Sequence, residues 1–459
     1  MNLRTFRSTP AGIASGKGLK GQLVRAGAGG MGVRILSLFA TLASSVVLAR
    51  VLGDVDYGIY AFALSVTALL ALPVQAGLPL LVIRETASAD SARDGTAMRS
   101  IIGWALRINI IFALVVVLAV LAVTLVAGDG ISTQDRLIFW LAALLILPVA
   151  LCSTLGAILR GLRKVMSGLY PIEVVRPLLI SLLVAAGVVL AAPNLDATAA
   201  LALNLVATLA VLALLVVLVM RALPPESRRM SGMQFQTSSW LKALVPLALM
   251  SSLHLVNQNA DMVMLGIFRE PQEVGYYKVA VSGAGFVIFG LSAIQVVAMP
   301  YVSRFHVERD PVRMQRLAAA CAGGSVLLAV PVFALYLAVG RPLIGLVYGA
   351  SFEAAWEPLM LLSIAQIING VFGIVWPLLV MTGNEKAGFR GMIVATAINV
   401  TLNAVLIPDM GAVGAAIATG ISVIVWNVLF WISARRLIGI DASPLGLLRR
   451  ARPPHKEAP

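Results

Sequence analysis

Charged residues are scarce in this sequence. Only 12% of its 459 residues are Asp, Glu, Lys or Arg, whereas 59% are hydrophobic and the mean hydropathy is +0.94. Soluble proteins usually carry about 25% charged residues, so this composition excludes an ordinary soluble globular protein. Cysteine is scarcer still. Cys152 and Cys321 both lie within apolar stretches, which excludes a framework of structural disulfides.

The sequence also lacks the motifs that enzymes need. It contains no glycine-rich phosphate loop followed by lysine, no cysteine or histidine spacing typical of a metal site, and no nucleophile triad. Little of the chain lies outside the apolar stretches, so there is no room for a soluble catalytic domain. We therefore expect a protein that is not an enzyme and holds no organic cofactor.

Apolar runs of about 20 residues are abundant, and this is the length of helix that crosses a hydrocarbon core of ~30 Å. We count twelve of them, at residues 31–52, 59–78, 101–127, 137–159, 169–191, 197–220, 240–265, 279–302, 317–339, 357–381, 388–407 and 411–432. The sequence therefore predicts an all-α polytopic membrane protein with twelve transmembrane helices. No small-residue cleavage site follows the first run, which indicates a retained helix rather than a signal peptide.

The positive charges are unevenly distributed along the chain. The net charge is +14, and most of the 35 Lys and Arg fall at alternate ends of the predicted helices, on the side that also carries both termini. Cytoplasmic loops of membrane proteins carry such an excess, so we expect both termini in the cytoplasm. The basic charge thus indicates topology and contact with anionic lipid headgroups, and we expect no nucleic-acid partner.

The chain repeats itself once. The letters LG followed by DYGIY at residues 52–60 recur as LG followed by EVGYY at residues 265–277. Two sets of six helices therefore follow each other, and because six is even, both sets begin on the same side, as in transporters with parallel repeats. The expected segments are a basic cytoplasmic arm (1–30), an N-terminal lobe (31–220), a cytoplasmic linker (221–239), a C-terminal lobe (240–436) and a basic cytoplasmic tail (437–459).

The stretch at residues 399–422, NVTLNAVLIPDMGAVGAAIATGIS, combines polar and small residues within the membrane. Asn399 and Asn403 lie four residues apart, so their amides share one helix face. After a turn at residues 408–411, the next helix has little side-chain bulk, which lets another backbone approach closely in lipid. Such a place suits ligand binding, and equally suits amides that bond neighbouring helices.

Two stretches carry a resemblance to a known family. Residues 48–66, LARVLGDVDYGIYAFALSV, resemble the opening of bacterial polysaccharide-export flippases, and residues 399–419 resemble their C-terminal signature. These proteins belong to the multidrug/oligosaccharidyl-lipid/polysaccharide exporter superfamily, and the resemblance extends over about residues 30–436. It implies a flippase that moves an undecaprenyl-pyrophosphate-linked oligosaccharide from the cytoplasmic to the periplasmic leaflet of the bacterial plasma membrane.

The resemblance also implies a mechanism and surroundings. Expected features are alternating access between two lobes, an ion gradient as the driving force, contact with membrane lipids, and polysaccharide polymerases or glycosyltransferases as partners. The main alternative is an ion-coupled multidrug or cation exporter of the same fold. That alternative predicts carboxylates in the cavity and few arginines.

Three arginines and one glutamate are candidates for substrate binding, because charged side chains within membrane helices are costly. Arg107 lies about eight residues inside the third predicted helix, roughly 12 Å deep at 1.5 Å per residue, and is the first candidate contact for a pyrophosphate. Arg34 lies about one turn inside the first helix, where it either reaches a cavity or extends to the headgroups. Arg176 has Glu173 one turn before it, so the two either neutralise each other or meet the substrate. These arginines favour an anionic substrate.

A polar cluster is predicted in the outer half of the membrane. Asp261 in the seventh helix lies at a depth similar to that of Asn403 and Thr419, and a hard cation such as Na⁺ prefers several oxygen ligands. The candidate ligands are Asp261, Asn399, Asn403, Thr419 and the Ala415 carbonyl. Lipid-precursor flippases of the superfamily hold a cation between the corresponding helices, although such relatives carry a carboxylate where this chain has Asn403. One negative charge fewer here would weaken the site or leave it unoccupied. The expected coupling ion is Na⁺ or H⁺, and we expect no other metal.

Other polar and aromatic residues permit two interpretations. His254 shares a helical stripe with Asp261 and is either a titrating group or a packed, hydrogen-bonded histidine. Four amides are expected either to line a sugar path or to join helices: Gln75, Gln295, Gln366 and Asn369. The aromatic residues Tyr57, Tyr60, Tyr276, Tyr277, Trp240 and Trp356 are expected at the membrane interfaces.

Overall fold

The computed structural model describes residues 19–75, 77–126, 132–190, 195–224, 237–444 and 446, and over these residues it is built of helices without a strand. The first half comprises α2 (Leu19–Leu70), α3 (Leu72–Gln75), α4 (Leu78–Ala92), α5 (Gly95–Val126), α6 (Thr133–Gly161), α7 (Val165–Tyr170), the π-helical turn η2 (Pro171–Val175), α8 (Arg176–Leu190) and α9 (Ala197–Ala222). The second half comprises α10 (Thr237–Phe268), α11 (Pro271–Val307), α12 (Pro311–Tyr348), the 3₁₀ turn η4 (Ala350–Ala355), α13 (Trp356–Phe372), α14 (Val375–Met381) and α15 (Glu385–Leu437). Helices satisfy the backbone hydrogen bonds in lipid, and the expected all-α membrane fold is confirmed.

The described chain contains ten helical segments long and apolar enough to cross a membrane, and two of them double back. In α2 the chain reverses at Gly53 (φ 75°). The two segments lie side by side, as a hydrogen bond of 2.7 Å between Ser45 and Tyr57 shows, although twelve residues separate them. In α15 it reverses at Gly411 (φ 55°), and the Ser422 hydroxyl donates to a carbonyl 27 residues earlier. Glycine suits both turns because it adopts positive φ without steric cost. Counted as separate passages, these hairpins bring the ten spans to the expected twelve, while the number of membrane crossings itself stays a prediction.

Three of the predicted helices are interrupted. The second is divided, because α2 ends at Leu70 and Pro79 opens α4. The fifth contains the π-helical turn that begins at Pro171. The tenth breaks at Gly373, between α13 and α14. Proline removes a backbone donor and favours such interruptions, and glycine permits them.

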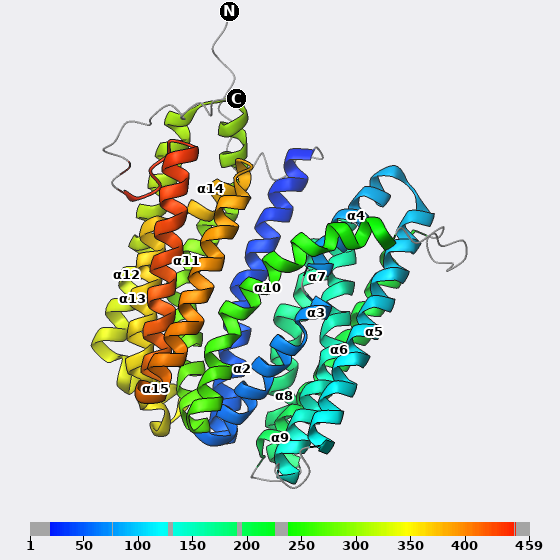
Figure 1. The fold of residues 1–459 in the computed structure, drawn as a ribbon, viewed down its shortest axis with the longest axis vertical. Coiled ribbons are helices and arrows are strands. Elements are labelled where there is room, and N and C mark those ends of the chain that lie inside the picture. Colours follow the sequence, from blue (N-terminus) through cyan, green and yellow to red (C-terminus); the bar gives the residue numbers. More distant parts are fainter. Residues whose placement is uncertain are drawn as a thin grey trace, which may run out of the picture.

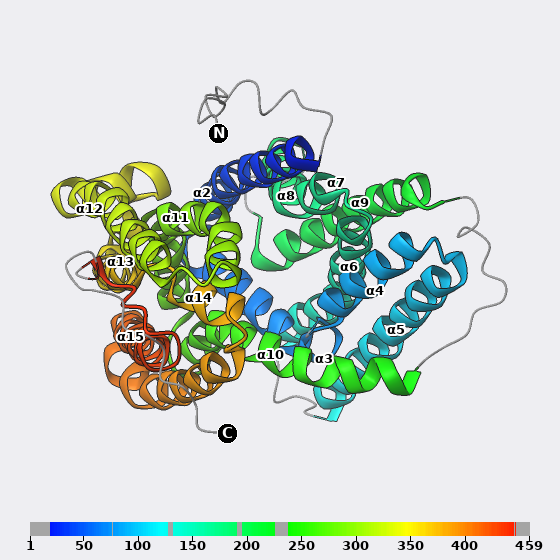
Figure 2. The same ribbon diagram turned by 90° about the horizontal axis from the view of Figure 1, so that it is seen from above.

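The helices gather into two groups, which we call the N-lobe (α2 to α9) and the C-lobe (α10 to α15). Figure 1 shows the groups in contact near the bottom of the view and diverging towards the top, where α2 begins at Leu19 and α15 ends at Leu437. In the view from above, α11 to α15 lie on one side, α4 to α9 on the other, and α10 runs between them (Figure 2). Trp240 near the start of α10 packs against Trp104 of α5, so this helix links the two groups. The lobe boundary stays a prediction, and residues 225–236 of the linker lie outside the described part of the chain.

The two copies of the sequence repeat meet where the lobes touch. A Cβ at Gly58 would lie 1.7 Å from the Pro271 carbonyl oxygen, and one at Gly275 would lie 2.8 Å from that of Asp54. The Tyr276 hydroxyl donates to the Asp54 carboxylate over 3.1 Å. The absence of side chains at the two glycines therefore lets the lobes approach to backbone contact. We call this contact the seam.

Each lobe is fastened by a carboxylate at equivalent positions of the repeat. In the N-lobe, Asp56 accepts a hydrogen bond of 3.0 Å from the N–H of Ala197, the first residue of α9. In the C-lobe, Glu273 accepts one of 2.8 Å from the N–H of Ala412, just after the turn in α15. A carboxylate is favourable at a helix amino terminus because the first N–H groups there have no partner in the helix. Each carboxylate thereby ties the start of the last helix of its lobe to an earlier helix.

Parts of the segments expected as arm and tail are structured. Helix α2 begins at Leu19, inside the stretch expected as a basic arm, and residues 1–18 lie outside the described residues. At the other end Asp441 is buried, and Gln315 of α12 donates to its carbonyl oxygen over 2.6 Å. The start of the expected tail therefore packs on the C-lobe, and residues 447–459 are outside the description.

Candidate functional site

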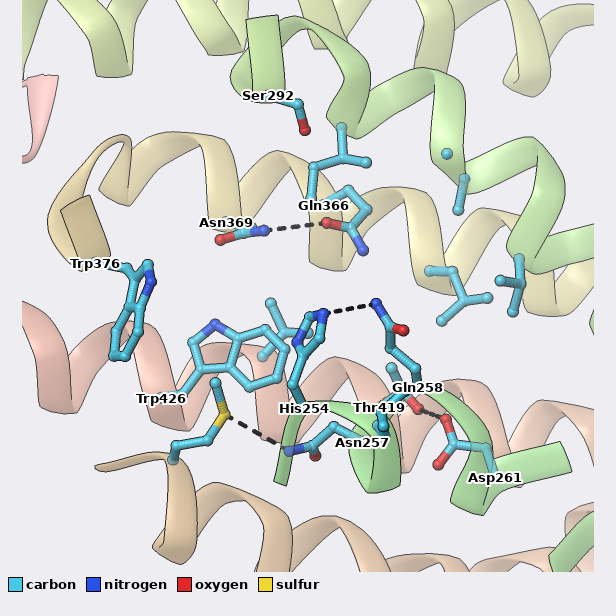
Figure 3. A pocket seen from close by; sticks show the side chains of 18 of the residues that line it. His254, Asn257, Gln258, Asp261, Ser292, Gln366, Asn369, Trp376, Thr419 and Trp426 are labelled. Carbon is cyan, nitrogen blue, oxygen red and sulfur yellow. Dashed lines mark hydrogen bonds between the residues drawn. The ribbon is translucent and has the colours of Figure 1, made fainter. Parts of the chain in front are cut away.

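A cavity of about 1040 Å³ lies within the C-lobe between α10, α11, α13 and α15 (Figure 3). Gln75 of α3 and Trp376 of α14 also contribute to its wall. Small-molecule sites commonly have volumes of ~300–1,000 Å³. The cavity is therefore large enough for a drug-sized ligand within the membrane part of the protein.

Carboxamide side chains dominate the polar part of the cavity wall. They are Gln75 from α3, Asn257, Gln258 and Asn259 from α10, Gln295 from α11, Gln366 and Asn369 from α13, and Asn427 from α15. Four of them, at positions 75, 295, 366 and 369, are the amides for which the sequence left two interpretations. All four line the cavity.

Several of these amides are linked into a chain. Asn427 donates to the Asn369 carboxamide oxygen over 3.0 Å, and Asn369 donates to the Gln366 oxygen over 3.2 Å. On the α10 side the His254 ring and the Gln258 amide are 3.0 Å apart, and both side chains are exposed to the cavity. Figure 3 shows these groups facing one another across the cavity. The wall is therefore held in place by its own hydrogen bonds.

The predicted polar cluster assembles at one side of this cavity. Asp261 is buried, and its carboxylate accepts hydrogen bonds from the Asn403 amide over 2.6 Å and from the Tyr277 hydroxyl over 2.7 Å. The Thr419 hydroxyl donates to the same carboxylate. Asn403 also donates to the Asn399 oxygen over 3.2 Å, so the expected shared face of these two amides is confirmed as a contact.

The chemistry of this cluster fits a hard cation. It offers carboxylate, carboxamide and hydroxyl oxygens, the ligand types that such ions prefer. The Asn403 carboxamide oxygen is buried and has no hydrogen-bond partner among the described residues. Ala415 is fully buried close in sequence to Thr419. Elsewhere in the described chain no three or more His, Cys, Asp or Glu side chains gather as metal ligands.

Sequence reasoning missed Tyr277 and placed it at the membrane interface. Exposure at an interface is contradicted for four of the six aromatic residues, because Trp240 and the three tyrosines Tyr57, Tyr60 and Tyr277 are almost completely buried. Each of the three tyrosine hydroxyls has a partner: Ser45 for Tyr57, the Asn204 amide for Tyr60, and Asp261 for Tyr277. A tyrosine near the end of an apolar run is usually an interface anchor, and its hydroxyl finds a partner when packing buries it.

The indoles of the cavity wall were also missed. Trp376 and Trp426 line the cavity near His254 (Figure 3). One available signal is helical spacing: Thr419 and Trp426 lie seven residues apart in α15, which puts them on one helix face.

The four predicted substrate contacts do not line this cavity. Arg34 and Arg107 are exposed on α2 and α5 of the N-lobe. Arg176 lies deeper and donates to the Asn204 oxygen over 3.2 Å, while Asn204 donates to Tyr60. Their contact with a substrate stays a prediction.

The pairing of Glu173 with Arg176, one of the two expected interpretations, is wrong. Glu173 interacts electrostatically with Arg34 and Arg160 instead. The reason is the π-helical turn η2, which contains Glu173 and ends just before Arg176. A π turn is wider than an α turn, so residues three apart no longer share a face.

Lys278 is the one Lys or Arg among the residues that line the cavity. It lies just before the eighth predicted helix, and the sequence analysis assigned it no role. Its ammonium group makes no hydrogen bond or ion pair with the described residues. The cavity therefore contains a single ammonium group, close to Tyr277.

The profile of the polysaccharide biosynthesis protein family matches residues 47–357. The chain belongs to this family. The probable low-salt glycan biosynthesis flippase Agl15 of Haloferax volcanii is 27% identical over 169 residues, which are 37% of this chain and 36% of that protein. The probable flippase AglR of the same organism is 27% identical over 172 residues, with the same shares. The chain thus aligns with little more than a third of the length of these family relatives.

Solved structures show the same fold. An inward-facing multidrug resistance MATE family transporter of the MOP superfamily matches with a TM-score of 0.70 at 15% identity, covering 87% of this chain and 94% of that one. The lipid II flippase MurJ in an inward closed conformation matches with a TM-score of 0.68 at 13% identity, covering 88% and 86%. The resemblance expected from residues 48–66 and 399–419 is confirmed at the level of family and fold.

Proposed function

We propose that this polysaccharide biosynthesis protein is a flippase for a lipid-linked glycan. The observation that carries the proposal is the cavity of about 1040 Å³ inside the membrane fold, whose wall carries eight carboxamides. A charged, hydrated glycan head cannot cross hydrocarbon unaided, and a polar cavity between helices provides a path for it. The protein moves its substrate and transforms no bond, so it acts as a transporter rather than an enzyme.

The proposed substrate is an undecaprenyl-pyrophosphate-linked oligosaccharide, moved from the cytoplasmic to the outer leaflet of a bacterial plasma membrane. Its lipid tail stays in the bilayer while the head passes between the lobes. The residues proposed to bind the pyrophosphate are Arg34, Arg107 and Arg176, together with Glu173, which interacts with Arg34. Arginine suits this role because its planar fork binds phosphate oxygens in pairs.

Alternating access is the proposed mechanism. The lobes touch at the seam and diverge towards the end where α2 begins and α15 ends (Figure 1). The positive charge of the sequence favours the cytoplasm on that side, with both termini there. In this proposal the seam separates and the opposite ends approach as the substrate crosses. Polysaccharide polymerases or glycosyltransferases are the proposed partners on either side.

An ion gradient is proposed to drive the cycle through the cluster around Asp261. The Asp261 carboxylate, the Asn399 and Asn403 oxygens, the Thr419 hydroxyl and the Ala415 carbonyl would hold Na⁺, or Asp261 would take a proton. Asp261 and Thr419 also line the cavity. An ion bound there touches the same space as the substrate head, and this supports coupling.

A multidrug exporter of the same fold is the second candidate, because a multidrug transporter is among the structures with this fold. A cationic drug needs an available carboxylate. Asp261 is the one carboxylate among the described residues of the cavity wall, and three side chains already donate to it. This favours the flippase over the exporter.

Reconstitution tests the proposal. The wild type and Arg107→Ala are placed in liposomes with a fluorescent undecaprenyl-pyrophosphate oligosaccharide, and outer-leaflet fluorescence is followed with a membrane-impermeant quencher. We expect transport by the wild type, a loss of about tenfold or more in Arg107→Ala, and no loss in Arg221→Ala at the end of α9. Transport of a cationic dye, without transport of any such lipid, would identify an exporter instead.

A further inference from the structure

The wall of the C-lobe cavity is rich in hydrogen-bonding groups and almost without charge. Eight carboxamides, two serines and two indoles line it, whereas Lys278 is its one Lys or Arg. A carboxamide donates and accepts at the same time, which matches a ligand whose hydroxyls also do both. An indole offers a flat apolar face, which matches the C–H face of a sugar ring.

Part of this hydrogen-bonding capacity is unused by the protein. The Gln366 oxygen accepts from Asn369, which leaves the Gln366 amide nitrogen without a partner among the described residues, on the side that faces His254 in Figure 3. Ser292 and Gln295 have no hydrogen bond to other described side chains. Because polar groups in a membrane interior need partners, water or a polar ligand must satisfy them.

The two indoles differ in how the protein holds them. Trp376 is packed against Phe430, with ring centroids 5.3 Å apart. Trp426 has no ring partner among the described residues and lines the cavity on α15. Trp426 is half-buried against the hydrophobic core of the C-lobe, and the part of its indole that lines the cavity is open to a ligand. The amide of Asn427 follows it directly in the chain.

The charge pattern argues against two other ligands for this cavity. A pyrophosphate requires several cationic donors, and Lys278 alone lines the wall. An organic cation requires a free carboxylate, and Asp261 is buried beneath three hydrogen-bond donors. A neutral or singly charged, hydroxyl-rich ligand is the remaining match.

We propose that this C-lobe cavity is the glycan-binding site, separate from the place where the pyrophosphate is held, and that Gln366, Ser292 and Trp426 determine which sugars it accepts. Gln366 donates to a ring hydroxyl, Ser292 bonds a second hydroxyl, and Trp426 covers a sugar face. Lys278 accommodates one acidic group on the glycan. This assignment rests on the proposed flippase function and adds to it where the sugars bind.

Equilibrium binding to lipid-free glycans tests the assignment without requiring transport. The purified full chain in nanodiscs is titrated by calorimetry with a panel of short neutral and singly anionic oligosaccharides, and with tetraphenylphosphonium as an organic cation. The variants are Gln366→Ala, Trp426→Ala and Gln366→Glu. Trp140→Ala is the matched control, because Trp140 donates to Thr124 in the N-lobe, away from the cavity.

The expected result is binding of at least one oligosaccharide, weakened about tenfold or more, or ~1.4 kcal/mol, in Gln366→Ala and Trp426→Ala and unchanged in Trp140→Ala. Circular dichroism and gel filtration check that each variant is folded. The assignment is overturned if both cavity variants bind the oligosaccharide as tightly as the wild type does. It is also overturned if the wild type binds no member of the panel. Tetraphenylphosphonium binding that Gln366→Glu tightens overturns it as well.

The flipping assay separates the two proposals. Loss of oligosaccharide binding with flipping intact overturns the glycan site and leaves the flippase. Oligosaccharide binding with the expected pattern, in a protein that flips no lipid-linked glycan, overturns the flippase and leaves a glycan-binding cavity.

Discussion

Asp261 is the one acidic residue among the described residues that line the C-lobe cavity. Its carboxylate is buried and is stabilised by neutral donors rather than by a basic side chain. Removing a charged group from water is costly unless other interactions compensate. A bound cation would supply compensation that the three donors do not, since each of them carries no net charge.

We predict that Na⁺ stabilises the wild type and that Asp261→Asn abolishes this effect. The measurement is the apparent unfolding temperature in NaCl against choline chloride at equal ionic strength. Asn403→Asp adds a second carboxylate beside the first, so its apparent affinity for Na⁺ should rise about tenfold, or ~1.4 kcal/mol. Equal unfolding temperatures in both salts, with a strong dependence on pH, would point to H⁺ instead.

Tyr277 links α11 to this carboxylate. We predict that Tyr277→Phe destabilises the protein by ~1–3 kcal/mol, because a buried charged acceptor loses a donor, and that it weakens the response to Na⁺. Tyr60→Phe is the matched control, since Tyr60 occupies the same place in the other repeat and accepts from a neutral amide, Asn204. A lower unfolding temperature without a changed ion response in Tyr277→Phe would show a purely structural role.

Residue spacing predicted part of this site. The four-residue interval between Asn399 and Asn403 and the depth of Asp261 and Thr419 were sufficient to bring those side chains together. Tyr277 could not be found in this way, because its contact with Asp261 depends on how α10 and α11 pack against each other. The same reason applies to Lys278 and the indoles, whose position in a cavity depends on packing between helices.

At the scale of elements, the two helical hairpins turn at glycines with different surroundings. Gly411 has positive φ, and a Cβ there would lie 1.6 Å from a Glu273 carboxylate oxygen. Gly53 also has positive φ, but no atom of another part of the chain would lie within 4 Å of a Cβ there. Strain in the backbone is therefore shared by both turns, while steric overlap is specific to Gly411.

We predict that Gly411→Ala destabilises the protein more than Gly53→Ala does. Both substitutions cost about 1–3 kcal/mol for the left-handed backbone, and Gly411→Ala also displaces Glu273 from the N–H of Ala412. Thermal unfolding in nanodiscs measures the difference. Equal losses in the two variants would mean that the carboxylate contact adds nothing to the turn.

The sequence predicted the helices better than their interruptions. Twelve apolar runs correspond to the spans and hairpins of the structure, because hydrophobic length is decided locally. The π-helical turn at Pro171–Val175 was not predicted, although Pro171 begins it and Pro177 follows it closely. As a result Glu173 was assigned the wrong partner, since one widened turn rotates the side chains that follow.

At the scale of the whole molecule, the parallel repeat was visible in the letters DYGIY and EVGYY. Their contact in the seam was not, because spatial adjacency of two repeats depends on how the lobes pack. The sequence placed the candidate arginines in the first half of the chain. It did not show that the cavity lies in the C-lobe. In the structure the amides line this cavity, and the arginines do not.

We predict that the seam opens during transport. In a background with Cys152→Ala and Cys321→Ala, the pair Asp54→Cys and Tyr276→Cys should be joined by a short bifunctional thiol reagent, and the link should block flipping. Adding Gly58→Val should reduce crosslinking at least several-fold, because its side chain overlaps the Pro271 carbonyl.

Gly32→Val is the control for the seam, since Gly32 lies in the same helix α2 with nothing within 4 Å of a Cβ there. It should leave crosslinking unchanged. Unhindered flipping by the crosslinked pair would contradict a mechanism in which the lobes part at the seam.

The two carboxylate fastenings have a consequence for assembly. Asp56 closes the first bundle on the start of α9, and Glu273 closes the second on the segment of α15 that begins after the turn at Gly411, so neither bundle depends on the other for its own closure. Two polypeptides encoded separately, divided within residues 225–236, should therefore find each other in the bilayer and recover flipping when produced together. The single chain would then behave as two six-helix units, each of which closes on its own and which associate afterwards.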